Sequence, residues 1–335
     1  MKKFRICYLI ITAAVLAGSI FCLHPSVPAQ ASVSEPDAQA AGQTAGTTRI
    51  LVLGCDRAAA LTDSILLVSL EAPSGALRIL QLPRDTYAVY TDRDYKKLNG
   101  AYAVLGLDGM KQFLSQSLGV SIDYAAALDL DCVSALVDAV GGVDVEITQP
   151  MQYTDPSQNL LIDLQPGMQH LDGRQAEHFL RYRSGYANAD LGRMDAQKRF
   201  LQAYLQKCQT IGAGGLVRMM LAVLPKMQTD LPVQEAVRLV QLLPQADIAE
   251  VPMTTAPGEA VRGSSGAWYY SLNRADMICA VNTYLLPQVP VTDASFDPNR
   301  VYDRQDFPEF HRIYTAPGTW EGAVSQSTVK SEERT

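Results

Sequence analysis

Three short, largely apolar runs lie close together early in the chain, at residues 50–54, 65–70 and 77–82. Runs of this length suit strands that are buried on both faces of a sheet. The first run ends at a glycine, and the last ends at Pro83, which has no backbone N–H to continue a hydrogen-bonded ladder. We therefore expect a buried sheet here, with the chain turning after each run.

Helical spacing follows after residue 100. Between residues 106 and 118 the apolar side chains fall close to a 3.6-residue period, and similar patterns predict further helices. Strands that alternate with helices in this way indicate an α/β sandwich with a mainly buried sheet. The predicted elements after residue 100 are helices at 106–118, 130–140, 194–208, 233–243 and 276–286, a helix capped by Asp172, and a strand at 248–253.

The N-terminus carries the pattern of an export signal. Lys2, Lys3 and Arg5 precede an uncharged apolar segment, residues 6–23, which spans roughly 27 Å as a helix and can cross a bilayer. The basic flank is expected to stay in the cytoplasm. We therefore predict a cytoplasmic stub at 1–5 and a transmembrane signal anchor at 6–23.

The next segment bears on whether the protein is anchored or secreted. Residues 24–48 are rich in Ala, Gln, Ser, Gly and Thr, a composition typical of a flexible linker. A small-x-small sequence ending at Ala31 fits signal peptidase, so a cleaved, secreted form is the alternative to a retained anchor. In both cases we expect an extracellular folded domain at 49–290 and an irregular C-terminal tail at 291–335.

Charge and motifs exclude several classes of protein. The chain has 335 residues, a formal net charge of -7 and a pI near 5.2, which argues against a broad basic face for nucleic acid. It has no P-loop, no GxGxxG after a strand, no GxSxG elbow and no HExxH motif. Its histidines are scattered, so a hydrolase with a Ser-His-Asp triad is not expected.

Four cysteines, Cys55, Cys132, Cys208 and Cys279, lie beyond the apolar N-terminal segment. In an exported domain such cysteines either form disulfides or act as small buried hydrophobic side chains. No Cys or His spacing indicates zinc.

The strongest chemical signal is an arginine-rich block near the middle of the chain. If residues 179–183 are extended, Arg181 and Arg183 project to one face, while Arg193 and Gln197 share a face of the next helix. Planar guanidinium groups suit phosphate oxygens, so the block predicts an anion site. The alternative is a lattice of solvated salt bridges. The aspartates that would take part in it are Asp172, Asp190 and Asp195.

Charged residues also stand at the ends of the predicted strands. Arg84 and Asp85 directly follow the third strand, where ligands of α/β folds bind. Asp56 follows the first strand and Asp63 precedes the second, so their carboxylates suit Mg²⁺, which prefers oxygen ligands. Lys97 precedes a helix and would add a phosphate contact. Taken singly, each of these is also an ordinary turn, cap or surface residue.

Together these segments resemble the LytR–CpsA–Psr (LCP) family of exported cell-wall ligases. The similarity covers about residues 49–290 and rests on many motifs in the same order. One departure is Ala196, where the family often has an arginine before the glutamine, which implies a lower affinity for phosphate. The matching motifs are residues 50–56, 62–64, 82–85, 97–102, 141–145 and 166–173, and the block from Arg181 to Gln197.

The resemblance implies a three-layer α/β/α sandwich around a mixed central sheet, with a long apolar pocket for a polyprenyl chain. It also assigns roles to the charged residues, including a Mg²⁺ ion as cofactor. The implied catalytic residues are Arg84, Asp85, Arg181 and Arg183; the implied pyrophosphate-binding residues are Arg84, Lys97, Arg181, Arg183, Asp190, Arg193 and Gln197; and the implied Mg²⁺ ligands are Asp56 and Asp63.

The implied reaction moves an anionic glycopolymer, such as teichoic acid or capsule, from a polyprenyl-pyrophosphate carrier at the membrane to peptidoglycan. An acceptor sugar hydroxyl attacks the phosphorus next to the glycan, and polyprenyl phosphate leaves. Asp85 is either the general base or the residue that orients Arg84. A non-catalytic protein that binds the polyprenyl phosphate, or a carrier pyrophosphatase, is the main alternative. Export and acidity count against a transcriptional attenuator.

Overall fold

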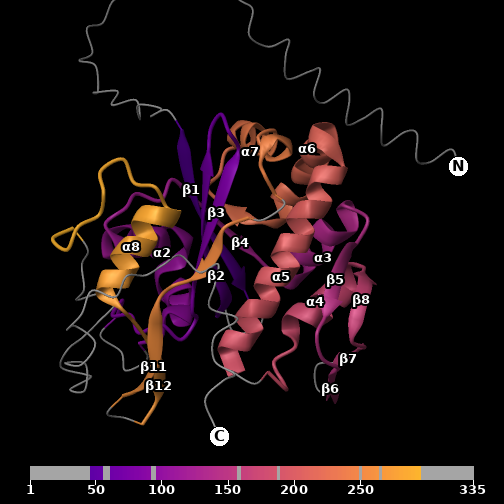
Figure 1. Ribbon diagram of the computed structural model, residues 1–335, viewed down its shortest axis with the longest axis horizontal. Coiled ribbons are helices and arrows are strands. Elements are labelled where there is room, and N and C mark those ends of the chain that lie inside the picture. The colour runs from indigo at the N-terminus through magenta and orange to yellow at the C-terminus, as the bar shows by residue number, and fades with distance from the viewer. Residues whose placement is uncertain are drawn as a thin grey trace, which may run out of the picture. The chain divides into compact units, whose positions relative to one another are not determined.

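The computed structural model describes residues 46–55, 61–91, 96–156, 160–186, 189–248, 251–263 and 266–295. Its centre is a six-stranded sheet (Figure 1). In spatial order, the strands are β10 (Met253–Thr255), β3 (Ala76–Leu82), β2 (Thr62–Glu71), β1 (Thr47–Cys55), β4 (Tyr124–Leu128) and β9 (Gln228–Thr229).

Strand directions make this sheet mixed. The pairs β1–β4 and β3–β10 are parallel, whereas β1–β2, β2–β3 and β4–β9 are antiparallel. The prediction of an α/β fold around a mixed central sheet is therefore confirmed. The three early apolar runs correspond to the three central strands β1, β2 and β3.

Seven helices and three two-stranded ribbons surround the sheet in the described part of the chain. The helices are α2 (Ala101–Leu118), α3 (Leu130–Ala139), α4 (Gly173–Arg181), α5 (Ala189–Thr210), α6 (Gly212–Val223), α7 (Val233–Val240) and α8 (Arg274–Tyr284), with 3₁₀ turns η1 (Leu98–Gly100), η3 (Leu224–Lys226) and η4 (Leu243–Gln245). The ribbons pair β5 (Val143–Ile147) with β8 (Gly167–Leu171), β6 (Met151–Asp155) with β7 (Leu160–Leu164), and β11 (Gly258–Arg262) with β12 (Trp268–Leu272).

The two faces of the sheet bury different side chains, because neighbouring residues of a strand point to opposite faces. Leu51 and Leu53 of β1 are fully buried in a cluster with Met110 of α2 and Met277 of α8. Figure 1 shows α2 and α8 together on this side of the sheet. These two helices form one outer layer.

Helix α5 lies over the opposite face (Figure 1). Its Leu205 packs with Ile79 of β3 and Leu239 of α7. A further apolar cluster joins α3, α4, α5 and α6 to the ribbons β5–β8 and β6–β7. Helices therefore cover both faces of the sheet, and α3 and α5 stand over the face that carries the site described below.

Several element boundaries differ from the sequence-based expectation, for example the start of α5 at Ala189 where residue 194 was expected. The helix expected from residue 106 begins at Ala101, but Gly106 interrupts it with φ 69°, a backbone conformation that favours glycine. The strand expected at 248–253 is wrong, since β10 starts only at Met253. Short apolar stretches between loops do not define where pairing starts.

The described cysteines are all free thiols, so none of them forms a disulfide. Cys132 and Cys208 are buried, Cys55 is half-buried and Cys279 is exposed.

Within the described ranges, no single helix is long and apolar enough to cross a membrane, although the bent pair 191–210 and 212–226, at 119°, passes on length and composition. The predicted stub at 1–5, the predicted anchor at 6–23 and nearly all of the predicted linker at 24–48 lie outside the described residues. So does the tail beyond residue 295.

Candidate functional site

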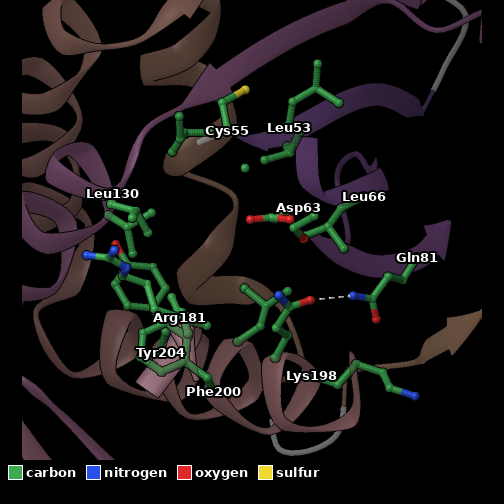
Figure 2. Close-up of a pocket in the computed structure, with 18 of the residues that line it drawn as sticks. Leu53, Cys55, Asp63, Leu66, Gln81, Leu130, Arg181, Lys198, Phe200 and Tyr204 are labelled. Carbon is green, nitrogen blue, oxygen red and sulfur yellow. Dashed lines mark hydrogen bonds between the residues drawn. The ribbon is translucent and has the colours of Figure 1, made fainter. Parts of the chain in front are cut away.

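A cavity of about 580 Å³ lies between the strands β1, β2 and β3 and the helices α3 and α5. This volume is in the range of small-molecule sites. In Figure 2, Leu130 and Tyr204 line one side of it, and Gln81 and Lys198 line the other. Most of the wall is apolar. The apolar lining includes Val52, Leu66, Ile79, Val133, Leu136, Leu160, Phe200, Leu201 and Met253.

Polar side chains gather at one part of the cavity, which we call the polar mouth and define as Asp63, Arg181, Arg183 and Ser184. Arg183 and Ser184 are exposed, so this part opens to solvent. Asp63 stands at the start of β2, where β1 ends and the chain turns back. The mouth therefore lies at one edge of the central sheet.

Three arginines from different parts of the chain converge on Asp63. Arg84 Nη1 donates a hydrogen bond to Asp63 Oδ1 at 2.9 Å, and Arg183 donates to Oδ2. Arg193 Nη1 lies 3.5 Å from Oδ1, and its Nη2 donates to the Asp63 backbone carbonyl at 3.2 Å. Arg193 is only 3% exposed. Three guanidinium groups thus contact one carboxylate.

The ionisation of Asp63 reflects this cluster. Burial alone would raise the pKa of Asp63, but the charges of Arg183, Arg193 and Arg84, together with the hydrogen bond from Arg84, outweigh burial and hold the pKa below its usual range. Asp63 is therefore a carboxylate at neutral pH. Its two oxygens accept from guanidinium donors of the kind that also bind phosphate oxygens.

One expectation about this block is wrong. Residues 179–181 are the end of helix α4, not part of a strand, and the backbone becomes extended only at Tyr182. The Asp172 cap and the Gln175 capping box start this helix, as expected from the cap residue. Arg181 pairs with Glu177 one turn earlier at 3.1 Å and still lines the cavity. Arg181 and Arg183 both line the polar mouth because helix α4 ends at Arg181 and the backbone is extended after it.

The alternative prediction, salt bridges between the arginines and nearby aspartates, is supported in part, but the aspartate that pairs with the arginines is not one of those expected. Asp172 accepts a hydrogen bond from the Gln175 backbone as a helix cap, and Asp195 pairs with Lys198 at 2.7 Å. The carboxylate that meets the arginines is Asp63 instead. Among the described contacts, Asp63 is the carboxylate that Arg84, Arg183 and Arg193 share.

Lys97 and Asp85 form a second ion pair, with Lys97 Nζ 3.0 Å from Asp85 Oδ1, and neither residue lines the cavity. Lys97 Nζ also lies 5.8 Å from the centre of the Tyr269 ring, within the range of a cation–π contact. The described contact of the Asp85 carboxylate is thus with Lys97, while the neighbouring Arg84 contacts Asp63. Arg84 and Asp85, adjacent in sequence, link the two ion pairs.

Gln197 lines the cavity as expected from the sequence, but its partner was not foreseen. Gln81 Nε2 donates a hydrogen bond to Gln197 Oε1 at 2.9 Å. Gln81 lies in β3, also lines the cavity and is 2% exposed. A polar residue inside a predicted buried strand was the one signal in the sequence that could have identified it.

Two predicted site residues cannot be placed. Asp56 lies outside the described residues, and Asp190 belongs to α5 but its side chain is not described. No group of three or more His, Cys, Asp or Glu side chains able to hold a metal occurs in the described ranges. Of the two predicted Mg²⁺ ligands, the described residues supply only Asp63, whose oxygens already accept from arginines.

Cys55 lines the cavity close to the mouth. Burial, followed by the charges of Asp129 and Asp63, raises the pKa of the Cys55 thiol to about 12. A neutral thiol is a poor nucleophile, so covalent catalysis by Cys55 is not supported.

Two curated proteins are similar to this chain in sequence. A teichoic acid transferase from Bacillus cereus, named polyisoprenyl-teichoic acid–peptidoglycan teichoic acid transferase TagU, is 27% identical over 226 residues, which cover 66% of this chain and 72% of that protein. The probable cell wall biosynthesis protein LcpB of Corynebacterium glutamicum is 30% identical over 230 residues, 63% of this chain and 54% of its own length.

Solved structures show the same fold. Bacillus subtilis TagV superposes with a TM-score of 0.62 at 20% identity, covering 73% of this chain and 100% of TagV. TagT bound to LI-WTA superposes with a TM-score of 0.58 at 21% identity, covering 72% of this chain and 91% of that chain. The model of the LytR_cpsA_psr family matches residues 24–283. Since this match spans most of the chain, the protein belongs to the LytR–CpsA–Psr family.

Proposed function

We propose that the protein is a phosphotransferase that moves an anionic glycopolymer from a polyprenyl-pyrophosphate carrier to peptidoglycan and forms a phosphodiester bond. The observation that carries this proposal is the convergence of Arg84, Arg183 and Arg193 on Asp63 beside an apolar cavity. A polyprenyl pyrophosphate has a charged head and a long hydrocarbon tail, which match the arginine cluster and the apolar cavity. The name of the relative TagU describes a transfer of this kind.

The cavity and the arginine cluster would hold different parts of the donor. The apolar wall from α3 and α5 would take the prenyl chain, because burial of hydrocarbon is favourable. The pyrophosphate would lie at the polar mouth, where forked guanidinium groups match phosphate oxygens. Attack by an acceptor hydroxyl on the phosphorus next to the glycan forms the new P–O bond, and the bond to polyprenyl phosphate breaks.

The arginines would act mainly by electrostatics. Phosphoryl transfer asks the protein to position the groups and to neutralise developing charge, and donors fixed in advance do this without reorganisation. Asp63 holds Arg84 and Arg193 in place before substrate binds. A phosphate that arrives would share these donors with Asp63, so the cluster is prepared for an anion.

Mg²⁺ stays a prediction. When bound, a magnesium ion neutralises phosphate charge. Because the described residues supply one carboxylate of the two expected, we assign no step to the ion.

The attachment of the chain to a membrane by residues 6–23, with the folded domain outside the cell, is likewise proposed from the sequence pattern.

The test is in vitro transfer from a short polyprenyl-pyrophosphate glycan to a peptidoglycan acceptor, with Mg²⁺ present. Arg183→Ala should lose at least about tenfold in rate while remaining folded. Arg174→Ala is the matched control, since Arg174 is an exposed arginine of α4 that does not line the cavity. An unchanged transfer rate in Arg183→Ala would contradict the proposal that the arginines promote the transfer. Binding of the donor without transfer by the wild type would support a carrier-binding protein, and release of phosphate without transfer a pyrophosphatase.

A further inference from the structure

Gln81 is a buried polar residue at the edge of the site. It lies in the central strand β3, its side chain points toward α5, and it is 2% exposed (Figure 2). Gln81 Nε2 donates to Gln197 Oε1 across the cavity wall. A fully buried amide costs free energy unless its groups are hydrogen-bonded, so its place in an otherwise apolar strand calls for a reason.

The hydrogen bond determines which end of the Gln197 amide faces the ligand. An amide has an acceptor oxygen and a donor NH₂ group on opposite sides of one planar carbon. Because Gln197 Oε1 accepts from Gln81, the NH₂ group of Gln197 is directed away from Gln81. Gln197 also lies four residues after Arg193 on α5, so the two side chains share a helix face. Arg193 contacts Asp63 at the mouth.

Further polar groups lie next to this hydrogen bond. Gln81 Oε1 is buried and has no hydrogen-bond partner in the part of the chain that the structure describes. Lys198, also in the cavity wall, donates to Thr255 at 3.3 Å, and Thr255 lies opposite Gln81 in the β3–β10 pair. Polar groups therefore continue from the mouth into the cavity along one side.

We propose that Gln81 is a positioning residue that holds Gln197 with its NH₂ group toward the polar mouth, where Gln197 donates to a phosphate oxygen of the donor substrate. This inference rests on the proposed function, because it requires a phosphate group at the mouth. Without Gln81, the Gln197 amide is free to rotate and to turn its oxygen toward the anion, which repels it. Gln81 thus contributes to the preference for a charged head without touching it.

The experiment compares two probes that differ only in the head group. Geranylgeranyl pyrophosphate and geranylgeraniol are titrated by calorimetry into the whole chain, and the ratio of their dissociation constants measures the preference for pyrophosphate. The variants are Gln81→Met, Gln197→Met and the double variant, since methionine keeps the length of glutamine but removes its hydrogen bonds. Their melting temperatures are measured in parallel.

Gln81→Met should reduce the pyrophosphate preference roughly three- to tenfold and leave geranylgeraniol binding unchanged. Gln197→Met should do the same, and the double variant should be no worse than Gln197→Met, because the first residue acts through the second. Gln202→Met is the matched control. Gln202 lies on the same helix but bonds the backbone of Ile248 and Val251, so its loss should lower the melting temperature and leave the preference intact.

An unchanged preference in Gln81→Met, a parallel loss for both probes, or additive effects in the double variant would each overturn the inference. Should Gln81→Met fail to fold, Gln81→Leu replaces it, and an unchanged preference in Gln197→Met alone is still sufficient to refute the role of the amide. If the wild type binds both probes equally, the proposed function fails first and this inference fails with it. A wild type that discriminates while its variants do not differ from it overturns only the role of Gln81.

Discussion

Asp63 and Arg84 join two sheet strands at the point where both reach the mouth of the cavity, with Arg84 Nη1 2.9 Å from Asp63 Oδ1. Both side chains are mostly buried, and Arg183 and Arg193 add two further positive charges to the same carboxylate. Asp63 is thus the counter-ion of an arginine cluster that would otherwise repel itself. It stabilises the fold and competes with any anion that binds there.

Replacement of Asp63 by asparagine should therefore have two opposite effects. The variant Asp63→Asn removes the carboxylate that three guanidinium groups share. It should lower the free energy of unfolding by about 1–3 kcal/mol, which is less than the loss of a fully buried ion pair because Asp63 is 30% exposed. It should also bind inorganic pyrophosphate more tightly than the wild type. Thermal unfolding with and without pyrophosphate measures both, and a smaller stabilisation of Asp63→Asn by pyrophosphate would contradict the prediction.

The same cluster predicts how stability depends on pH. The pKa of Asp63 is lower in the folded protein than in the unfolded chain, where an aspartate titrates near about 3.9. The folded state thus binds fewer protons at this group, and its stabilisation is fully present above the unfolded pKa and is lost as the pH falls through the folded pKa. The difference in melting temperature between wild type and Asp63→Asn should be constant from pH 7 to about 5 and shrink below about pH 4. A difference that grows on acidification would show the opposite sign.

Part of this site follows from the sequence and part does not. Arg193 and Gln197 were placed on one helix face by their spacing, and Arg84 at the mouth by its position after a strand; both are local rules. The end of α4 at Arg181 was missed because no glycine or proline directly follows Arg181 to mark the end of the helix. Gln81 was missed for a different reason: its partner is 116 residues away, and no local pattern encodes such a contact.

Asp85 offers a test of the division between catalysis and positioning. Its carboxylate is paired with Lys97 at 3.0 Å, so it fixes the ammonium group of Lys97. We expect Asp85→Asn to raise the KM for the lipid donor several-fold and to leave kcat nearly unchanged. Steady-state transfer kinetics measure the two constants. A loss in kcat of about 10²–10⁴ with an unchanged KM would instead identify Asp85 as the general base.

Substitution of one cavity-lining residue by a large side chain should block the apolar cavity. Val133 of α3 lines it and is half-buried, so an indole at this position can enter the cavity with little disturbance of the packed core. Val133→Trp should weaken geranylgeraniol binding at least about tenfold, because the prenyl chain loses its volume, and should change inorganic pyrophosphate binding by less than about twofold, since the arginines stay in place. Val233→Trp, at an exposed position of α7 outside the cavity lining, is the control and should alter neither.

Calorimetric titration with geranylgeraniol and with inorganic pyrophosphate measures binding to the apolar cavity and to the arginine cluster separately. Undiminished geranylgeraniol binding in Val133→Trp would mean that the hydrocarbon lies elsewhere, whereas a parallel loss of pyrophosphate binding would mean that the cavity and the mouth are one cooperative unit.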